Sequence, residues 1–345
     1  MKALTYQGPE QVALSDVADA ALPGDEGAVV RITASGICGS DLHIYHGHGF
    51  SETTGYSLGH EAVGIVEEVG AAVRTVRPGD RVLVAASAAC GRCTPCAHGH
   101  ITLCETGQAG CWGLGHAHAG TQAEALSVPA ADRNLFPLPE ALSDAAGVVL
   151  TDNLPTAWYG ARRGRVGPGD TVAVVGLGPV GLLSVLSAQV MGAARVLAID
   201  LVPERRAAAA ALGAEPVEGD DVRAAVAEAT AGRGVDVALE AVGADATLTL
   251  ALDLAGRAGR VSIVGVNQSM DLSVRMALAQ LKGLEIHIGL CSVQHELPTL
   301  LKLAAAGRID PNVVVTHTMA LADGPDAYAL FASRADGVGK IVLTP

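Results

Sequence analysis

The sequence has few aromatic and few basic side chains. Only 3% of its 345 residues are Phe, Trp or Tyr, and 23 Lys and Arg stand against 36 Asp and Glu. The net charge is −13, and Lys and Arg form no cluster of note. A surface that follows nucleic-acid phosphates needs such a cluster, so we expect no nucleic-acid partner.

Long apolar runs are also missing. A bilayer-spanning helix needs about 18 uncharged apolar residues, and Arg195 interrupts the best candidate stretch. The segment MKALTYQGPE carries one Lys and no apolar core of signal-peptide length. We therefore expect no membrane partner and a cytoplasmic protein, where thiols stay reduced. The odd count of seven cysteines also fits poorly with a closed disulfide framework.

Four of these cysteines fall within residues 90–104. Cys90, Cys93, Cys96 and Cys104 have the spacing C-x2-C-x2-C-x7-C. Short gaps let successive thiolates turn onto one ion, and four thiolates close a tetrahedron with no open position. We expect a structural zinc. An iron–sulfur cluster uses similar gaps and stays open as an alternative, as does the absence of any metal.

The chain is too long for one ordinary core, which predicts two domains. Short Val- and Ile-rich runs at 27–38, 61–70 and 80–87 are bounded by glycines and turns, so residues 1 to about 150 are expected to form a β-rich, barrel-like domain. After 291 the pattern predicts a helix at 295–308 and strands at 312–319 and 339–345, and we expect this segment to return to the first domain.

The middle of the chain has a different rhythm. Runs at 171–176, 194–200, 235–243, 259–265 and 284–289 are typical of buried strands, and helical stretches such as 203–214 and 244–256 lie between them. Strands that alternate with helices predict a parallel, doubly wound sheet and hence an α/β fold class.

A dinucleotide-binding motif follows the first of these strands. Residues 176–181 read GLGPVG, and Asp200 closes the next strand nineteen residues after the last glycine. This context distinguishes the motif from a chance match. Gly176 permits the tight turn, Gly178 lets the backbone approach a pyrophosphate, and Gly181 lets the helix pack on the sheet. The loop residues expected to contact the cofactor are Gly176, Gly178, Pro179, Val180 and Gly181.

Asp200 is expected to accept hydrogen bonds from the adenosine ribose, which favours NAD because a 2′-phosphate would face its charge. Arg205 lies one turn further and could weaken that preference, so NADP stays open. A similar fold that binds another nucleotide, or none, is the remaining alternative.

Two further stretches carry potential metal ligands. Cys38 lies in GICGSDLH and His60 in GHEAVG, each at the end of a strand-like run among glycines. Taken singly, each residue is better explained as a buried thiol or a structural histidine. Their combination with the four-cysteine segment and the dinucleotide motif favours a second zinc site.

These motifs, in this order and over the whole chain, closely resemble the zinc-containing medium-chain alcohol dehydrogenases. The resemblance implies a GroES-like catalytic domain at 1–151 and 292–345 and a Rossmann domain at 152–291. It also implies that Cys38 and His60 hold a catalytic zinc. Many members use cysteine as the third ligand, but the matching stretch VVLTDNLPTAWYG has none. Asp152 occupies that position, as in formaldehyde-dehydrogenase-like and several bacterial branches.

The resemblance also assigns catalytic roles. Ser40 would take the alcohol proton and pass it through the nicotinamide ribose to His43, whose near-neutral pKa suits a proton exit. Glu61 would be an acid behind the ligands that can approach the metal, and Thr156 would pack behind the nicotinamide. A surface histidine and a solvated glutamate are the alternatives for His43 and Glu61.

Further cofactor contacts are expected at strand ends. Val242 follows one strand, and Val264 and Val266 follow another, where parallel sheets bind nicotinamide. Lys340 matches a basic residue that reaches the pyrophosphate, with a surface lysine as the alternative. Candidates for the substrate wall are Tyr45, His48, Phe50, Trp112 and Trp158. The histidine-rich loops at 43–48 and 116–118 have no assigned role.

We therefore predict an NAD-dependent zinc alcohol dehydrogenase with two Zn²⁺ per chain, a small-molecule alcohol or carbonyl substrate, and a homodimeric or homotetrameric state. Polyol, threonine and formaldehyde dehydrogenases share the same metal chemistry. A zinc-free NADPH enone or quinone reductase and a non-catalytic nucleotide-binding protein are the other classes considered.

Overall fold

The computed structural model describes residues 1–49, 51, 53–106, 110–219, 221–269, 271, 274–335 and 337–345. They form two compact units: unit 1 comprises Met1–Pro155 and Ser292–Pro345, and unit 2 comprises Thr156–Cys291. The boundary that we expected at 151/152 lies four residues earlier than the boundary between these units. Within the described ranges, no helix is long and apolar enough to cross a membrane.

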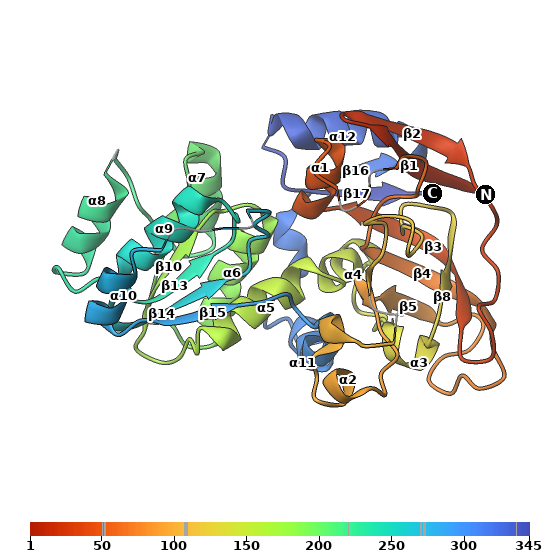
Figure 1. The fold of residues 1–345 in the computed structure, drawn as a ribbon, viewed down its shortest axis with the longest axis horizontal. Helices are drawn as coiled ribbons and strands as arrows, with labels where there is room; N and C mark the ends of the chain where they lie inside the picture. The colour runs from red at the N-terminus through yellow and green to blue at the C-terminus, as the bar shows by residue number, and fades with distance from the viewer. Residues whose placement is uncertain are drawn as a thin grey trace. The chain divides into compact units, whose positions relative to one another are not determined.

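Unit 1 is built on a seven-stranded sheet in the order β16-β17-β3-β4-β5-β9, with β8 paired to β3 (Figure 1). Its strands are β3 (Ala28–Ile37), β4 (Ala62–Val69), β5 (Arg81–Val84), β8 (Ala125–Val128), β9 (Leu135–Pro137), β16 (Val315–Ala320) and β17 (Lys340–Thr344). Two small ribbons accompany it, β1 (Lys2–Gly8) with β2 (Gln11–Asp16) and β6 (Ser87–Ala88) with β7 (Gly110–Cys111).

The end of the chain completes this sheet. Strand β17 pairs antiparallel with β3, placing Ile341 opposite Ile37, and parallel with β16. Strand β3 ends at Ile37, the residue before Cys38, so Lys340 lies beside this end of the strand. The predicted strand at 312–319 is partly wrong: Pro311–Val314 form a 3₁₀ turn, because the Asp310 side chain accepts a hydrogen bond from the N–H of Asn312, and β16 begins only at Val315.

The helices of unit 1 are short. They are α1 (Gly39–Tyr45), α2 (Thr94–Ala97), α3 (Ala131–Asn134), α4 (Asp144–Leu150), α11 (Val293–Ala305) and α12 (Gly324–Ser333), with 3₁₀ turns η1 (Ile101–Leu103), η2 (Pro311–Val314) and η3 (Leu321–Asp323). Helix α5 (Asn153–Arg163) begins in unit 1 and continues in unit 2.

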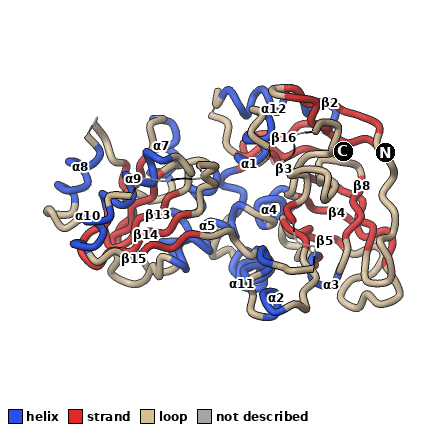
Figure 2. Tube along the Cα trace, in the orientation of Figure 1, coloured by secondary structure: helices blue, strands red, loops and turns tan. Residues whose placement is uncertain are grey.

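Unit 2 is a parallel six-stranded sheet with the order β12-β11-β10-β13-β14-β15. Its strands β13, β14 and β15 are labelled in Figures 1 and 2. Its strands are β10 (Thr171–Val175), β11 (Arg195–Ile199), β12 (Glu215–Pro216), β13 (Val235–Glu240), β14 (Ala255–Ile263) and β15 (Glu285–Ile288). Its helices are α6 (Pro179–Val190), α7 (Pro203–Ala211), α8 (Val222–Ala229), α9 (Asp245–Leu254) and α10 (Met276–Lys282). The order reverses between β10 and β13, which is the doubly wound Rossmann arrangement. The predicted fold class is confirmed.

Burial explains why these strands read as continuous apolar runs. In β10, Val172, Ala173 and Val174 are all fully buried, since helices pack on the sheet: α6 against β10 and β11, and α9 against β13 and β14. Parallel sheets covered in this way lack the alternation of half-exposed strands. The carboxyl ends of β10 and β13 therefore meet at the point of reversal, where such sheets bind ligands.

Candidate active site and metal centres

Unit 1 brings Cys38, His60 and Asp152 together. Cys38 follows β3 and caps α1, His60 precedes β4 by two residues, and Asp152 lies between α4 and α5. His60 Nε2 is 3.5 Å from Asp152 Oδ2, and Cys38 Sγ is 3.6 Å from the same oxygen. Ligand atoms of these three residues and of Glu61 all lie within 4.8 Å of one another.

Asp41, a residue that we did not predict, contacts the Cys38 backbone and the His60 ring. Its Oδ2 accepts the N–H of Cys38 at 2.9 Å, and its Oδ1 lies 3.3 Å from His60 Nδ1. A carboxylate on Nδ1 leaves Nε2 free to bind a cation. The signal was present in sequence, because an acid three residues after a helix-capping residue commonly binds the cap N–H.

The donor set fits zinc. One thiolate, one imidazole and one carboxylate are a protein ligand set that zinc accepts, with a fourth position left open in catalytic sites. Thiolate and carboxylate together balance the charge of a bound dication. Burial by itself would lower the pKa of His60, but the neighbouring Cys111, Asp41 and Asp152 outweigh it and raise that pKa. The same acids that raise it would attract a metal cation.

Behind the ligands, Glu61 pairs with Lys340. Both side chains are buried, with exposed fractions of 0% and 1%. Lys340 Nζ donates to Glu61 Oε2 at 2.6 Å, to Oε1 at 2.8 Å and to the carbonyl of Ile37 at 2.9 Å. Burial would lower the pKa of Lys340, but the facing Glu61 carboxylate raises it. The expectation that Lys340 reaches a pyrophosphate is at odds with this geometry, because its three N–H donors are all engaged, and it is no surface lysine either.

The four cysteines of residues 90–104 also converge. Their sulfur atoms lie within 4.8 Å of one another, and the N–H groups of Arg92 and Cys93 point at Cys90 Sγ at 3.5 and 3.4 Å. Burial would raise the pKa of Cys90, but hydrogen bonds from Thr106 and from these two N–H groups lower it to about 6. Cys90 therefore favours the thiolate form that binds metal. In this four-cysteine lobe (residues 90–104) the pKa of Cys104 is also lowered, whereas burial raises the pKa of Cys96 to about 12.

In unit 2, the glycine-rich loop joins β10 to α6. Gly176 has φ +89°, a conformation that side chains disfavour. A Cβ on Gly181 would overlap the carbonyl oxygen of Gly176, whereas a Cβ on Gly178 would meet no atom within 4 Å. Helix α6 begins at Pro179 and turns its N-terminus, with its unpaired N–H groups, toward this loop. The loop can thus accept an anionic group at Gly178.

Asp200 lies at the end of β11 and holds the loop. Its Oδ2 accepts the N–H of Leu177 at 2.7 Å, and its Oδ1 accepts the N–H of Val202 at 2.9 Å. Arg205 Nη1 lies 3.8 Å from Oδ2. The carboxylate therefore has a structural role beside the ribose role expected from sequence.

The remaining cofactor candidates of unit 2 follow strands of the sheet. Val242 comes after β13 and is 46% exposed, and Val264 and Val266 come after β14, both partly exposed. Glu240, which the sequence analysis missed, fixes this edge: its buried Oε1 accepts the N–H groups of Val242 and Gly243, both at 2.9 Å. An acid ending an apolar strand was the available signal. Thr156 is partly exposed at the start of the unit.

The substrate-wall candidates separate into core and surface residues. Trp112 is 1% exposed and donates its indole N–H to the carbonyl of Ala85 at 2.7 Å, so it belongs to the core. Tyr45 is also buried, with its ring 5.6 Å from that of Tyr328. His48 is exposed, Trp158 is partly exposed, and Phe50 lies outside the described residues.

The histidine-rich loops join neither metal-ligand group found in the described ranges. His116 packs edge-on against Tyr56 and His118 against Trp112.

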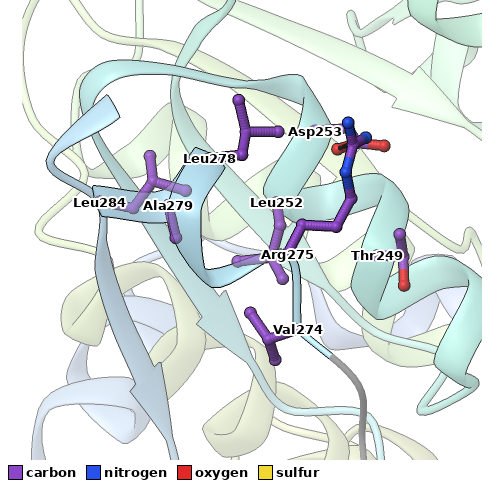
Figure 3. Close-up of a pocket in the computed structure, with 8 residues that line it drawn as sticks. All are labelled: Thr249, Leu252, Asp253, Val274, Arg275, Leu278, Ala279 and Leu284. Atoms are coloured by element: carbon purple, nitrogen blue, oxygen red, sulfur yellow. Dashed lines mark hydrogen bonds and ion pairs between the residues drawn. The ribbon is translucent and has the colours of Figure 1, made fainter. Parts of the chain in front are cut away.

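Figure 3 shows a pocket of unit 2 between α9 and α10, where Arg275 pairs with Asp253 at 3.2 Å. None of the predicted site residues lines this pocket.

Known proteins with similar sequences and folds cover the full chain. The alcohol dehydrogenase GroES-like domain family matches residues 24–140, and the zinc-binding dehydrogenase family matches residues 179–306. A probable zinc-binding alcohol dehydrogenase of Mycobacterium tuberculosis is 39% identical over 100% of this chain and 89% of its own length. An alcohol dehydrogenase of Cupriavidus necator is 36% identical over 100% and 99%. The structure of the alcohol dehydrogenase TADH from Thermus sp. ATN1 superposes with a TM-score of 0.94 at 40% identity, covering 100% of this chain and 99% of that one.

Proposed function

Because the chain belongs to the zinc-containing medium-chain alcohol dehydrogenase family, an oxidoreductase family, we propose that it transfers hydride between a primary or secondary alcohol and NAD. The observation that carries this proposal is the convergence of Cys38, His60 and Asp152 in unit 1. A zinc ion bound there would supply a Lewis acid for the alcohol or carbonyl oxygen.

The proton chemistry would fall to helix α1. Ser40 Oγ lies 3.2 Å from His60 Nε2, beside the proposed ligands, and would take the hydroxyl proton of the alcohol. His43 lies three residues further along the same helix, so both side chains project from one face. His43 is half-buried, and its pKa is lowered from 6.5, first by burial and then by His48 and His46. A neutral His43 is able to accept the proton and release it to solvent.

The cofactor assignment is supported by Asp200. NAD would place its ribose hydroxyls on this carboxylate and its pyrophosphate at Gly178, where α6 begins. NADP would bring a 2′-phosphate toward the same negative charge, with Arg205 as the nearby compensating cation. We therefore propose NAD, with NADP as the weaker cofactor.

We propose two zinc ions per chain, the second held by the four cysteines of residues 90–104. This site has no open position, so it would only stabilise the lobe. Its small core contains Cys90, Cys96 and Ile101, which supports a structural role for the metal.

We also propose a homo-oligomer, a dimer or tetramer, in the cytoplasm. Strand β15 is an edge of the unit 2 sheet, and apolar side chains near it are exposed: Leu281 by 83%, Ile288 by 71% and Leu290 by 65%. An exposed apolar edge strand favours pairing with another chain. Light scattering of the wild type and of Ile288→Lys tests this, with a lower mass expected for the variant.

Metal analysis joined to an alcohol panel tests the function. We expect two zinc ions per chain and NAD reduction, followed by absorbance, with at least one primary, secondary or polyol substrate. Cys38→Ser and Asp152→Ala should each retain one zinc and NADH binding but lose turnover by at least about 100-fold. One zinc in the wild type without turnover would favour a non-catalytic nucleotide-binding protein, and normal activity of either variant would refute the ligand assignment.

A further inference from the structure

We propose that Asn153 is a positioning residue of the metal centre, whose side-chain amide moderates the Cys38 thiolate and fixes the direction of Glu61. This inference rests on the proposed catalytic metal site. It concerns a neutral residue that no motif in the sequence singled out.

Asn153 sits at the start of α5, directly after the ligand Asp152, and is 1% exposed. Its Nδ2 lies 2.8 Å from Glu61 Oε1, 3.3 Å from Asp152 Oδ2 and 3.6 Å from Cys38 Sγ, within donor distance of each. One amide, with two N–H bonds, thus lies within donor distance of two proposed ligands and of the acid behind them, so at least one N–H is shared between two acceptors.

Glu61 is enclosed on several sides. Lys340 donates to both of its oxygens and Asn153 to one of them, while a Cβ on Gly36 would overlap Glu61 Oε2. The carboxylate therefore has little freedom to turn. Removal of the Asn153 donor would leave Oε1 of Glu61, next to the metal ligands, with Lys340 as its one remaining donor among these residues.

The charges explain why a neutral donor is useful here. Cys38, Asp152 and Glu61 contribute three negative charges, and the buried Asp41 beside them a fourth, against a bound dication and Lys340. A further cation would oppose metal binding, and a further anion would be unpaired in a buried site. An amide N–H draws electron density from the thiolate without changing this balance, and such donors tune the bound metal.

Cobalt substitution of the catalytic site, with zinc kept in the four-cysteine site, reports directly on the Cys38 thiolate. Loss of the N–H donor raises the energy of the sulfur electrons, so Asn153→Leu should shift the thiolate-to-cobalt absorption to longer wavelength. Asn153→Gln keeps a donor and should shift it less. We also expect kcat of the zinc form of Asn153→Leu to fall about 10–100-fold with little change in KM.

Thr33→Val is the matched control. It removes a partly buried hydrogen bond, to Asp144 Oδ2 at 2.6 Å, on the strand that leads to Cys38. It should lower the unfolding midpoint and leave the cobalt spectrum unchanged. Far-UV circular dichroism checks that each variant is folded.

An unchanged absorption band in Asn153→Leu would overturn the proposal, because the amide would then have no influence on the thiolate. Equal shifts in the Leu and Gln variants would also overturn it, because side-chain size or stability alone would then explain the shift. Absence of any thiolate-to-cobalt band in the wild type would instead refute the metal site itself, and this inference with it. A wild-type band that is lost in Cys38→Ser separates these two failures.

Discussion

Lys340 Nζ lies 2.6 Å from Glu61 Oε2, and neither side chain reaches solvent. The two residues are 279 positions apart in sequence, yet they form a buried ion pair directly behind the proposed zinc ligands. A charge buried without its partner is costly, so this pair couples the stability of unit 1 to the geometry of its metal centre.

Lys340→Met should therefore destabilise unit 1 by about 3–5 kcal/mol, because it leaves Glu61 buried and unpaired. Chemical denaturation of the zinc-loaded protein measures this. The double variant Lys340→Met with Glu61→Gln removes both charges and should recover much of the loss. NADH affinity should change little in either variant. A loss in the free energy of NADH binding that exceeds the loss in the free energy of unfolding would instead support a pyrophosphate contact for Lys340.

The glycine loop of unit 2 offers a matched pair of substitutions. Gly181→Ala places a Cβ against the carbonyl of Gly176 and should destabilise unit 2 by about 1–3 kcal/mol. Gly178→Ala meets no protein atom within 4 Å, so it should leave stability unchanged. It would occupy the space proposed for the pyrophosphate and weaken NADH binding at least about tenfold, or ~1.4 kcal/mol. Thermal unfolding and NADH fluorescence titration measure the two effects, and the reverse pattern would contradict the loop assignment.

Asp200→Gly should weaken NADH binding at least about tenfold more than NADPH binding, about 1.4 kcal/mol of lost discrimination. The carboxylate also holds the N–H groups of Leu177 and Val202, so some loss for both cofactors is expected. Asp200→Asn keeps an oxygen acceptor for that loop and serves as the control. Equal losses for both cofactors in Asp200→Gly would argue against the ribose role.

Turnover should depend on the protonation of His43, and this dependence should lie at a lower pH than for an ordinary histidine. Because burial and the nearby His48 and His46 lower its pKa from 6.5, we expect kcat/KM to fall only as the pH drops through that lowered value. The free energy of unfolding should change with pH in the same direction as the rate. Between the lowered pKa and 6.5 the unfolded chain binds more protons than the folded chain, so stability rises with pH in this window. In His43→Gln both dependences should flatten; pH profiles of rate and of urea midpoint that match the wild type would exclude His43 as the exit.

Local sequence patterns predicted the parts of the fold whose cause is local. The apolar runs of β10, β11 and β13, the glycines of 176–181 and the four cysteines each carry their physical reason within a short stretch. The reversal of strand order then follows from the alternation of strands and helices. The 3₁₀ turn at Pro311–Val314 escaped prediction because one hydrogen bond, from the N–H of Asn312 to the Asp310 side chain, overrides the strand preference of the β-branched residues.

Contacts between distant segments were the part that the sequence could not predict. Lys340 looked like a surface or phosphate-binding residue because nothing near it in sequence identifies Glu61 as its partner. Trp112 looked like a substrate contact because an aromatic residue in a polar stretch carries no sign of the strands that bury it. Asn153 was overlooked because a side-chain amide has no motif, and only its three acceptors show its role.

The discontinuity of unit 1 has a consequence for biosynthesis. Residues 156–291 form a contiguous unit that can fold as soon as they are made, since domains generally fold as units. Lys340, by contrast, is made near the end of synthesis. Glu61 and the first two proposed metal ligands, Cys38 and His60, are therefore synthesised long before the lysine that pairs with Glu61. Nascent chains would therefore pass through a stage in which unit 2 is folded while unit 1 still lacks its last strand. Chaperones and the cellular zinc supply would have the most influence at that stage.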